Sequence, residues 1–497
     1  MTTLKIQRPA DGTLIEEIPA HDAAHVAVVA ERLRDAQREW EQIGPKGRLV
    51  WIKRYRKWLL DNADHLVEIA MEEGGRVRNE PTLETTLLQE IIDYYIRVAP
   101  RLLAPKSVRG SSPLTFGKRY TVHRSPFPLV GVIGGWNFPL LLTIGDALPA
   151  LVAGAAVALK PSEVNPRAVV EAVRGWREDI GAPPVLDVLL GAGDVGAALV
   201  DAADFVQFTG SVATGRRVAV RAAESLTPVS LELGGKDPLI VLEGANIARA
   251  ANCAVYGGFA NNGQVCMGFE RVYVQHSVYD EFVDRVVAKV KSLRSGVDDR
   301  SDVGALTHPP QLDIVDRHVR EAVDKGARVL TGGNRIDRAG TWFEPTVLVD
   351  VDHSMAVMRE ETFGPVLPIV RVADADEAVR LANDSEFGLS ASVFAANTGE
   401  GERIAERLEA GAVSIDDFVA NMVCADVPQG GWKSSGVGSR LSETGLLKFT
   451  HTKVVASHWM PLPANDIFWF PYTPARRRLF AAAARLIHGR GPSRLGL

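Results

Sequence analysis

Residues 129–163 read LVGVIGGWNFPLLLTIGDALPALVAGAAVALKPSE and contain two short apolar runs separated by a helical stretch. The runs are Leu129–Ile133 and Ala155–Leu159, and apolar residues at helical spacing lie between them over Leu140–Ala153. Short apolar runs that alternate with helices are typical of parallel strands joined by crossover helices. The stretch therefore predicts a strand–helix–strand unit of a parallel sheet.

The same alternation continues along the chain. Further apolar runs lie at Val185–Leu190, Phe205–Phe208 and Val229–Leu231, with a helical stretch at Pro166–Trp176. After Cys266 a second series contains a strand at Arg271–Gln275, a helix at Val278–Leu293 and strands to about residue 413. Before the first unit, helical spacing of apolar residues is found in Ala23–Trp40, Arg48–Met71 and Leu83–Val98. These patterns predict an α/β fold, and the length predicts two or three domains.

The composition excludes several classes of protein. The 497 residues are 46% hydrophobic and 24% charged, and the formal net charge of −5 offers no basic field for nucleic acid. Three cysteines are too few for a disulfide framework and favour a reducing compartment, the cytoplasm. Residues 126–145 carry no charge, but three prolines and four glycines would break a membrane helix there. We expect a soluble cytoplasmic protein.

One cysteine has surroundings suited to chemistry. Residues 261–266 read Asn-Asn-Gly-Gln-Val-Cys, so Cys266 follows a loop-forming segment. Such a turn can present a thiol and a backbone N–H at one point, as a nucleophile and its oxyanion require. A free cysteine is also commonly a small buried residue, and from this segment alone that interpretation stays open. For Cys253 and Cys424 we adopt the interpretation as small buried residues.

Two glycine motifs are candidates for binding a dinucleotide. Gly191-Ala-Gly-Asp-Val-Gly196 fits GxGxxG, but arginines stand about twenty residues later, where an acid would bind the ribose. We interpret it as a turn into a helix at Ala197–Ala203. Phe208-Thr-Gly210-Ser211 predicts a tight turn and a helix N-terminus, where free N–H groups attract phosphate. Structural capping by Ser211 is the alternative.

Charged residues follow another predicted strand, in Lys160-Pro-Ser162-Glu163. At the carboxyl edge of a parallel sheet, Lys160 can bind a ribose hydroxyl or a phosphate, and Glu163 can accept from ribose hydroxyls. Glu163 would repel a 2′-phosphate, which favours NAD over NADP. The alternative is a solvated charged turn.

Two further groups suit catalysis. Asn137, in Trp136-Asn-Phe-Pro139, places an amide at a strand-to-helix turn, where it can donate to an oxyanion. Glu232 stands beside Gly234-Gly235 after a predicted strand and can serve as a general base on water.

Together these residues resemble the aldehyde dehydrogenase superfamily over about residues 10–455. Six blocks stand in family order: Trp136-Asn-Phe-Pro139, Lys160-Pro-Ser-Glu163, Phe208-Thr-Gly-Ser211, Glu232-Leu-Gly-Gly-Lys236, Gly263-Gln-Val-Cys266 and Glu360-Glu361-Thr-Phe363-Gly-Pro365. Each block alone is moderately specific, whereas six in order are highly specific.

The resemblance implies oxidation of an aldehyde to the acid with NAD, or alternatively NADP. Cys266 would attack the aldehyde, Asn137 and the Cys266 N–H would hold the oxyanion, and Glu232 would activate water against a thioester. The residues implied to bind the cofactor are Trp136, Asn137, Lys160, Ser162, Glu163, Gly210, Ser211, Leu233, Glu361 and Phe363. No metal is expected.

The resemblance also implies an architecture: a Rossmann-type cofactor domain (1–105 and 127–234), an α/β catalytic domain (235–435) and a small β bridging element (106–126 and 436–460). That element would join copies into a homodimer or homotetramer. A basic amphipathic tail would follow at 461–497, with Phe468-Trp-Phe470, an apolar stripe from Leu479 to Ile487, and arginines up to Arg494. We expect the tail to dock on a neighbouring subunit; contact with a membrane surface is the less favoured alternative.

Two positions depart from the family pattern. Many members carry Lys nine residues after the oxyanion Asn and Glu in a late Ser-Gly-x-Gly-x-Glu motif, where this chain has Asp146 and Arg440. The reversed signs allow a mirrored Asp146–Arg440 pair, or the two residues face unrelated partners.

Three other activities stay open as alternatives. The Cys-Met-x-x-Glu-Arg run at 266–271 is similar to that of some succinate-semialdehyde dehydrogenases. A CoA-acylating member would not need Glu232, and a non-catalytic member often lacks the nucleophile, so Glu232 and Cys266 argue against both. We expect Met267, Phe269 and the loop 416–423 to line a partly apolar substrate pocket.

Overall fold

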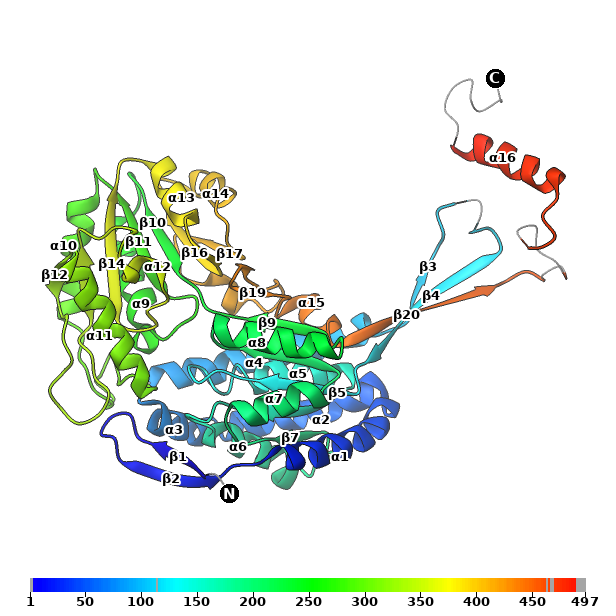
Figure 1. The fold of residues 1–497 in the computed structure, drawn as a ribbon, viewed down its shortest axis with the longest axis horizontal. Coiled ribbons are helices and arrows are strands. Elements are labelled where there is room, and N and C mark those ends of the chain that lie inside the picture. Colours follow the sequence, from blue (N-terminus) through cyan, green and yellow to red (C-terminus); the bar gives the residue numbers. More distant parts are fainter. Residues whose placement is uncertain (1–2, 113–114, 462–463, 465–468, 489–497) are drawn as a thin grey trace. The chain divides into compact units, whose positions relative to one another are not determined.

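The computed structural model describes residues 3–112, 115–461, 464 and 469–488. They form two compact units, one within residues 1–102 and 126–450 and the other within residues 103–125 and 451–497. Each unit contains helices and strands, which Figure 1 labels. The predicted tail residues Phe468, Arg490 and Arg494 lie outside the described residues.

A six-stranded sheet in the larger unit has the order β19-β9-β8-β5-β6-β7. Its strands are β5 (Leu129–Ile133), β6 (Ala156–Lys160), β7 (Leu186–Val188), β8 (Phe205–Thr209), β9 (Val229–Glu232) and β19 (Gly436–Val437). Only β19 is antiparallel to its neighbour. Because β5, β6 and β8 are buried along their whole length, their sequences are continuous apolar runs. The predicted strands of this region are confirmed.

The strand order reverses between β5 and β8. β6 and β7 follow β5 on one side, whereas β8 and β9 lie on the other. The connecting helices are α5 (Ile144–Ala153), α6 (Arg167–Arg174), α7 (Gly193–Ala202) and α8 (Val212–Glu224). Right-handed crossovers place the first two and the last two on opposite faces. Such a reversal leaves a crevice outside the carboxyl ends of the strands, where ligands of open α/β sheets bind.

The segment before this sheet contains the hairpin β1 (Thr3–Gln7)–β2 (Leu14–Pro19) and four helices. These are α1 (Ala23–Gln42), α2 (Gly44–Asp61), α3 (Ala63–Gly74) and α4 (Asn79–Leu102). The helical stretch predicted over Arg48–Met71 consists of two helices, α2 and α3, with an interruption at Asn62. The Asn62 side-chain amide donates to the carbonyl of Trp58 at 2.8 Å and its backbone leaves the helical region, which ends α2.

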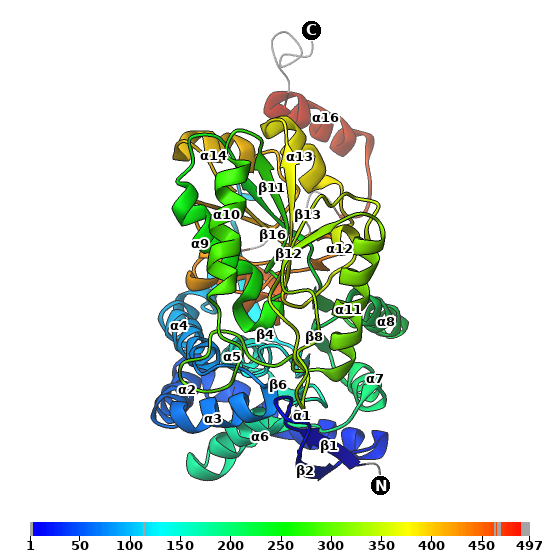
Figure 2. The ribbon, with the colours of Figure 1, turned by 90° about the vertical axis from the view of Figure 1, so that its left-hand side faces the viewer.

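The second sheet has seven strands in the order β12-β13-β14-β11-β10-β16-β17. They are β10 (Asp237–Val241), β11 (Phe269–Gln275), β12 (Arg328–Thr331), β13 (Thr346–Val349), β14 (Val366–Val372), β16 (Ser390–Phe394) and β17 (Ala412–Ile415). One hydrophobic cluster joins it to α9 (Ile247–Phe259) and α10 (Tyr279–Lys291). The other joins it to α11 (Pro309–Asp324), α12 (Ala356–Arg359), α13 (Ala375–Asn383) and α14 (Thr398–Ala405). The helices therefore cover both faces (Figure 2).

Short elements complete the larger unit and bring its last segment beside the six-stranded sheet. They are the pair β15 (Phe387–Gly388)–β18 (Trp432–Lys433) and helix α15 (Ser442–Leu447). β19 pairs with β9, so that Gly436 lies opposite Glu232. Of the bridging element predicted at 436–460, residues 436–450 thus belong to the larger unit.

The smaller unit contains the three-stranded sheet β20 (Thr450–His458)–β4 (Lys118–Pro126)–β3 (Lys106–Val108) and helix α16 (Pro474–His488). The predicted amphipathic helix of the tail is confirmed as α16. Leu479 and Leu486 on its apolar stripe are exposed. Among the described residues, no helix is long and apolar enough to cross a bilayer.

Candidate active site

Cys266 lies in the loop between the 3-10 turn Ala260–Gly263 and β11. Asn261, Asn262 and Gly263 adopt left-handed backbone angles in succession, with φ of 50°, 60° and 72°. Asparagine and glycine tolerate this region best, and a side chain at Gly263 would collide with the backbone oxygen of Gly364. The Asn-Asn-Gly segment is therefore required by the backbone that leads to Cys266.

The double glycine after β9 brings three segments together. A Cβ at Gly235 would collide with the backbone oxygen of Cys266, and one at Gly234 would lie 2.5 Å from a carboxyl oxygen of Glu361. The Gly235 N–H donates to Glu361 Oε1 at 3.0 Å. The absence of side chains at both positions lets the Cys266 loop and the Glu361 segment meet at the end of β9.

Asn137 is held against the loop of Cys266. Its side-chain Nδ2 donates to the backbone carbonyl of Gln264 at 3.0 Å. The backbone carbonyl of Asn137 accepts from Nδ2 of Asn261 at 3.1 Å. An amide carries two protons, so the bond to Gln264 leaves the second one for another acceptor. The side chain is buried, which fixes its orientation.

Glu232 ends β9 and is 3% exposed. Neither of its carboxyl oxygens has a hydrogen-bond partner among the described residues. Burial raises its pKa to about 7, while Arg440 and Lys448 act to lower it and Asp146 to raise it. A carboxyl group that titrates near neutral pH is suited to general base catalysis.

Cys266 is half-buried as a residue. Burial raises its pKa to about 12, Arg440 acts to lower it, and Glu361, Asp237 and Glu232 act to raise it. Because the thiolate is the nucleophilic form, this thiol needs a nearby base before it can attack.

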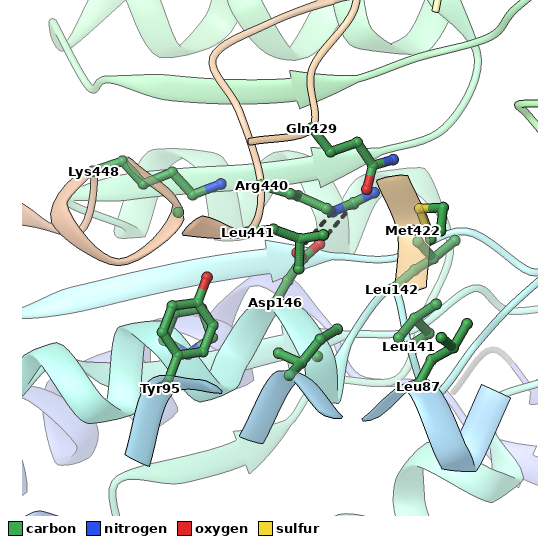
Figure 3. Close-up of a pocket in the computed structure, with 14 residues that line it drawn as sticks. Leu87, Tyr95, Leu141, Leu142, Asp146, Met422, Gln429, Arg440, Leu441 and Lys448 are labelled. Carbon is green, nitrogen blue, oxygen red and sulfur yellow. Dashed lines mark hydrogen bonds and ion pairs between the residues drawn. The ribbon is translucent and has the colours of Figure 1, made fainter. Parts of the chain in front are cut away.

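Asp146 and Arg440 form a buried pair, although they lie 294 positions apart in the chain. Arg440 Nε donates to Asp146 Oδ1 at 2.8 Å, and Nη2 donates to Asp146 Oδ2 at 2.7 Å (Figure 3). Nη2 also donates to Thr209 Oγ1. The mirrored pair is thus present, and the alternative of unrelated partners was wrong.

A cavity of about 850 Å³ lies outside the carboxyl ends of β5, β6 and β8, at the reversal of strand order. Six predicted cofactor residues line it: Trp136, Lys160, Ser162, Glu163, Gly210 and Ser211. Lys160 Nζ lies 3.2 Å from Glu163 Oε2, and Ser211 caps α8. The volume suits a dinucleotide, and two helix N-termini, those of α7 and α8, border the cavity and suit its phosphates.

The other predicted cofactor residues lie elsewhere around the site. The Phe363 ring contacts Trp136 edge to face with 5.2 Å between centroids. Leu233 is buried, and a Cβ at Gly215 of α8 would collide with its side chain. Glu361 lies against the double glycine described above.

Sequence reasoning missed two contributors. Glu270 accepts from the backbone N–H groups of Thr362 and Phe363 at 2.7 and 2.8 Å and holds Lys236, so it positions the Phe363 segment. The GxGxxG glycines were interpreted only as a turn, yet α7 already begins at Gly193, and Gly193 and Gly196 line the cofactor cavity. The GxGxxG motif was the signal that could have identified these glycines. The absence of an acidic residue about twenty positions later argued against a dinucleotide site there.

The residues expected to line the substrate pocket lie in different surroundings. Met422 lines a small cavity beside the Asp146–Arg440 pair. Phe269, in contrast, is buried in the core under α9 and contacts Phe418, and Met267 is buried against Gln429.

A Rossmann-type sheet with a dinucleotide-sized crevice, beside a loop cysteine, an amide and a buried carboxyl group, is the arrangement of a dinucleotide-dependent oxidoreductase. The model of the aldehyde dehydrogenase family matches residues 1–455. The chain belongs to this family and oxidises aldehydes to carboxylic acids with NAD(P).

Three known proteins illustrate the likeness. The chain is 37% identical to a 4,4'-diapolycopene aldehyde oxidase of Methylomonas sp over 493 residues, which cover 98% of this chain and 92% of the relative. It is 39% identical over 461 residues to a Mycobacterium ulcerans protein named as a succinate-semialdehyde dehydrogenase [NADP(+)], with coverage of 92% and 88%. A crystal structure of betaine aldehyde dehydrogenase from Staphylococcus aureus in complex with NAD+ superposes with a TM-score of 0.88 at 29% identity, covering 95% and 96%.

Proposed function

We propose that Cys266, Asn137 and Glu232 perform this oxidation. The observation that carries the proposal is the Glu232 carboxyl group, which is buried beside the Cys266 loop and whose two oxygens have no hydrogen-bond partner in the described part of the chain. Leaving a polar group without a partner costs free energy, so its retention supports a role toward a reacting molecule.

Glu232 first takes the proton of the Cys266 thiol, and the thiolate attacks the carbonyl carbon. The free amide proton of Asn137 and the backbone N–H of Cys266 stabilise the resulting oxyanion. Bound NAD(P) supplies the hydride acceptor that allows a thioester to form. Glu232 passes the thiol proton on to solvent and is ionised again. It then takes a proton from water, the hydroxide adds to the thioester, and the acid leaves as the Cys266 thiolate is released.

Lys160, Ser162 and Glu163 are proposed to bind the adenosine ribose, and Gly210 and Ser211 the pyrophosphate. Glu163 is part-exposed at the cavity, where its charge opposes a 2′-phosphate, although its ion pair with Lys160 weakens this effect. This geometry supports a preference for NAD over NADP.

An apolar aldehyde is the proposed substrate class. A cavity of about 430 Å³ adjoins Phe138, next to Asn137, and Ala260, at the turn before Cys266. Apolar residues of its lining are Leu83, Phe138, Val255, Tyr256, Phe259 and Ala260, and its charged residues are Glu80, Lys289 and Asp302. Arg440, a cation of the site, is already bonded to Asp146 and is therefore a poor partner for a substrate carboxylate.

An aldehyde screen tests these assignments. We expect kcat/KM, followed by NADH absorbance, to rise along a series of straight-chain and aromatic aldehydes, by about threefold to fourfold per buried methylene at ~0.8 kcal/mol each. NAD should give the higher kcat/KM in a parallel series with NADP. Higher kcat/KM for succinate semialdehyde than for the apolar series would instead support the semialdehyde alternative.

The division into cofactor (1–105, 127–234) and catalytic (235–435) domains remains a proposal, supported by the separate six- and seven-stranded sheets. The three free cysteines support a location in the cytoplasm.

The smaller unit is proposed to join copies into a homodimer or homotetramer. Val454, Val455 and Trp459 are exposed on and beyond β20, which is an edge strand of its sheet, and exposed edge strands pair readily with another chain. Light scattering after size-exclusion chromatography should give two or four times the chain mass of 53.8 kDa. A monomeric mass at micromolar concentration would contradict the assignment.

A further inference from the structure

Three charged side chains line one small cavity behind the proposed base. Asp146, Arg440 and Lys448 all border a space of about 30 Å³, together with Tyr95 and several leucines (Figure 3). The reaction steps proposed above use none of these charged groups.

Arg440 is a fixed cation close to Glu232. Asp146 binds it through two parallel hydrogen bonds, and it also donates to Thr209 Oγ1. Thr209 lies directly opposite Glu232 in the pairing of β8 with β9. Because a guanidinium keeps its charge throughout the working pH range, Arg440 is a permanent positive charge beside the base.

Lys448 follows helix α15, and its side chain binds residues of the same two strands, β8 and β9. Its Nζ donates to Gln207 Oε1 at 2.6 Å, Ser230 Oγ at 3.1 Å and the carbonyl of Ser439 at 2.8 Å. Gln207 pairs with Ser230 two positions before Thr209 pairs with Glu232, so all four side chains share one face. Two residues along a strand correspond to about 7 Å, which places the ammonium within effective range of the Glu232 carboxyl group.

The two cations near Glu232 favour the ionised form of its carboxyl group. Opposite charges nearby favour the ionised carboxylate, whereas burial disfavours it. Arg440 and Lys448 lower the pKa of Glu232 against the effects of burial and Asp146. Lys448 faces Asp146, Glu232 and Arg440, and burial lowers its own pKa to about 8.

We propose that Lys448, together with Arg440 held by Asp146, is a positioning residue that keeps Glu232 ionised and thereby sets the rate at which the thioester is hydrolysed. The inference rests on Glu232 as the base of the proposed function. Neither cation touches the substrate; both act through the Glu232 carboxylate.

The test compares Lys448→Met with Lys448→Arg in the full-length protein. Without the ammonium, the midpoint of the acidic limb of the kcat profile should move to higher pH by about one unit. At pH 7 kcat should fall about fivefold to tenfold, while the first turnover, seen as a burst of NADH, keeps its amplitude. Lys448→Arg retains the charge and should restore the wild-type midpoint.

Arg48→Met is the matched control. Arg48 is a buried cation that donates to the carbonyls of Val152 and Ala153, away from Glu232. We expect it to lower Tm without moving the pH midpoint. A purely structural role for Lys448 would lower Tm in the same way and leave the midpoint unchanged in Lys448→Met, which overturns the proposal.

Should Lys448→Met not fold, Arg440→Lys and Arg440→Gln provide the same comparison, with the midpoint raised only in the uncharged variant. An unshifted midpoint in Arg440→Gln also overturns the proposal. If Glu232→Gln hydrolyses the thioester normally, the proposed function fails; if Glu232→Gln is blocked while Lys448→Met behaves as wild type, only this inference fails.

Discussion

Cys266→Ser is expected to lower kcat/KM by about a thousandfold or more, because an alcohol at this position is far harder to ionise than the thiol it replaces. The loss should appear in the first turnover as well as in steady state, since the attack itself is prevented. Stopped-flow measurement of NADH formation with saturating aldehyde checks both.

Cys253→Ser is the matched control for this substitution. Cys253 lies in α9, packed against the hydrophobic cluster of the seven-stranded sheet, and burial raises its pKa to about 12 as it does for Cys266. The two thiols therefore differ in their position relative to the site, and Cys253→Ser should retain turnover. Full turnover in Cys266→Ser would remove Cys266 as the nucleophile.

Glu232→Gln is expected to reduce kcat by about a hundredfold to ten-thousandfold, the usual contribution of a general base. If an acyl group still reaches Cys266, it should accumulate there, because no carboxylate activates the water. Mass spectrometry of the quenched protein should then show Cys266 heavier by the acyl group.

The pH dependence of the reaction rate provides a second test of Glu232. A base must be ionised, and the pKa of Glu232 is raised to about 7, so the wild-type rate should rise with pH through about 7. Glu232→Gln should lose this rise. Glu73→Gln is the control, because Glu73 is also buried with a pKa raised to about 7 but binds the backbone N–H groups of Arg167 and Ala168. An undiminished rate in Glu232→Gln would exclude Glu232 from the mechanism.

Much of the fold could be predicted because its signals are local. The apolar runs of β5, β6 and β8 identify buried parallel strands, and Ser211 and Asn137 stand where their strands end. The interruption at Asn62 was missed, since apolar spacing continues across it and the break comes from one amide bonded to the carbonyl of Trp58. Glu270 was missed because a carboxylate within a strand, here β11, gives no sign in the sequence of which backbone N–H groups it binds.

The sequence by itself determined the α/β class, the family and the residues proposed for chemistry, because short motifs encode the turns and strand ends that present them. Only the tertiary structure decided that Asp146 binds Arg440 and that Lys448 binds side chains of β8 and β9, the strand pair that ends at Glu232. The physical reason is that charge pairing depends on distance in space, and the strand order and the return of residues 436–450 to the six-stranded sheet set that distance.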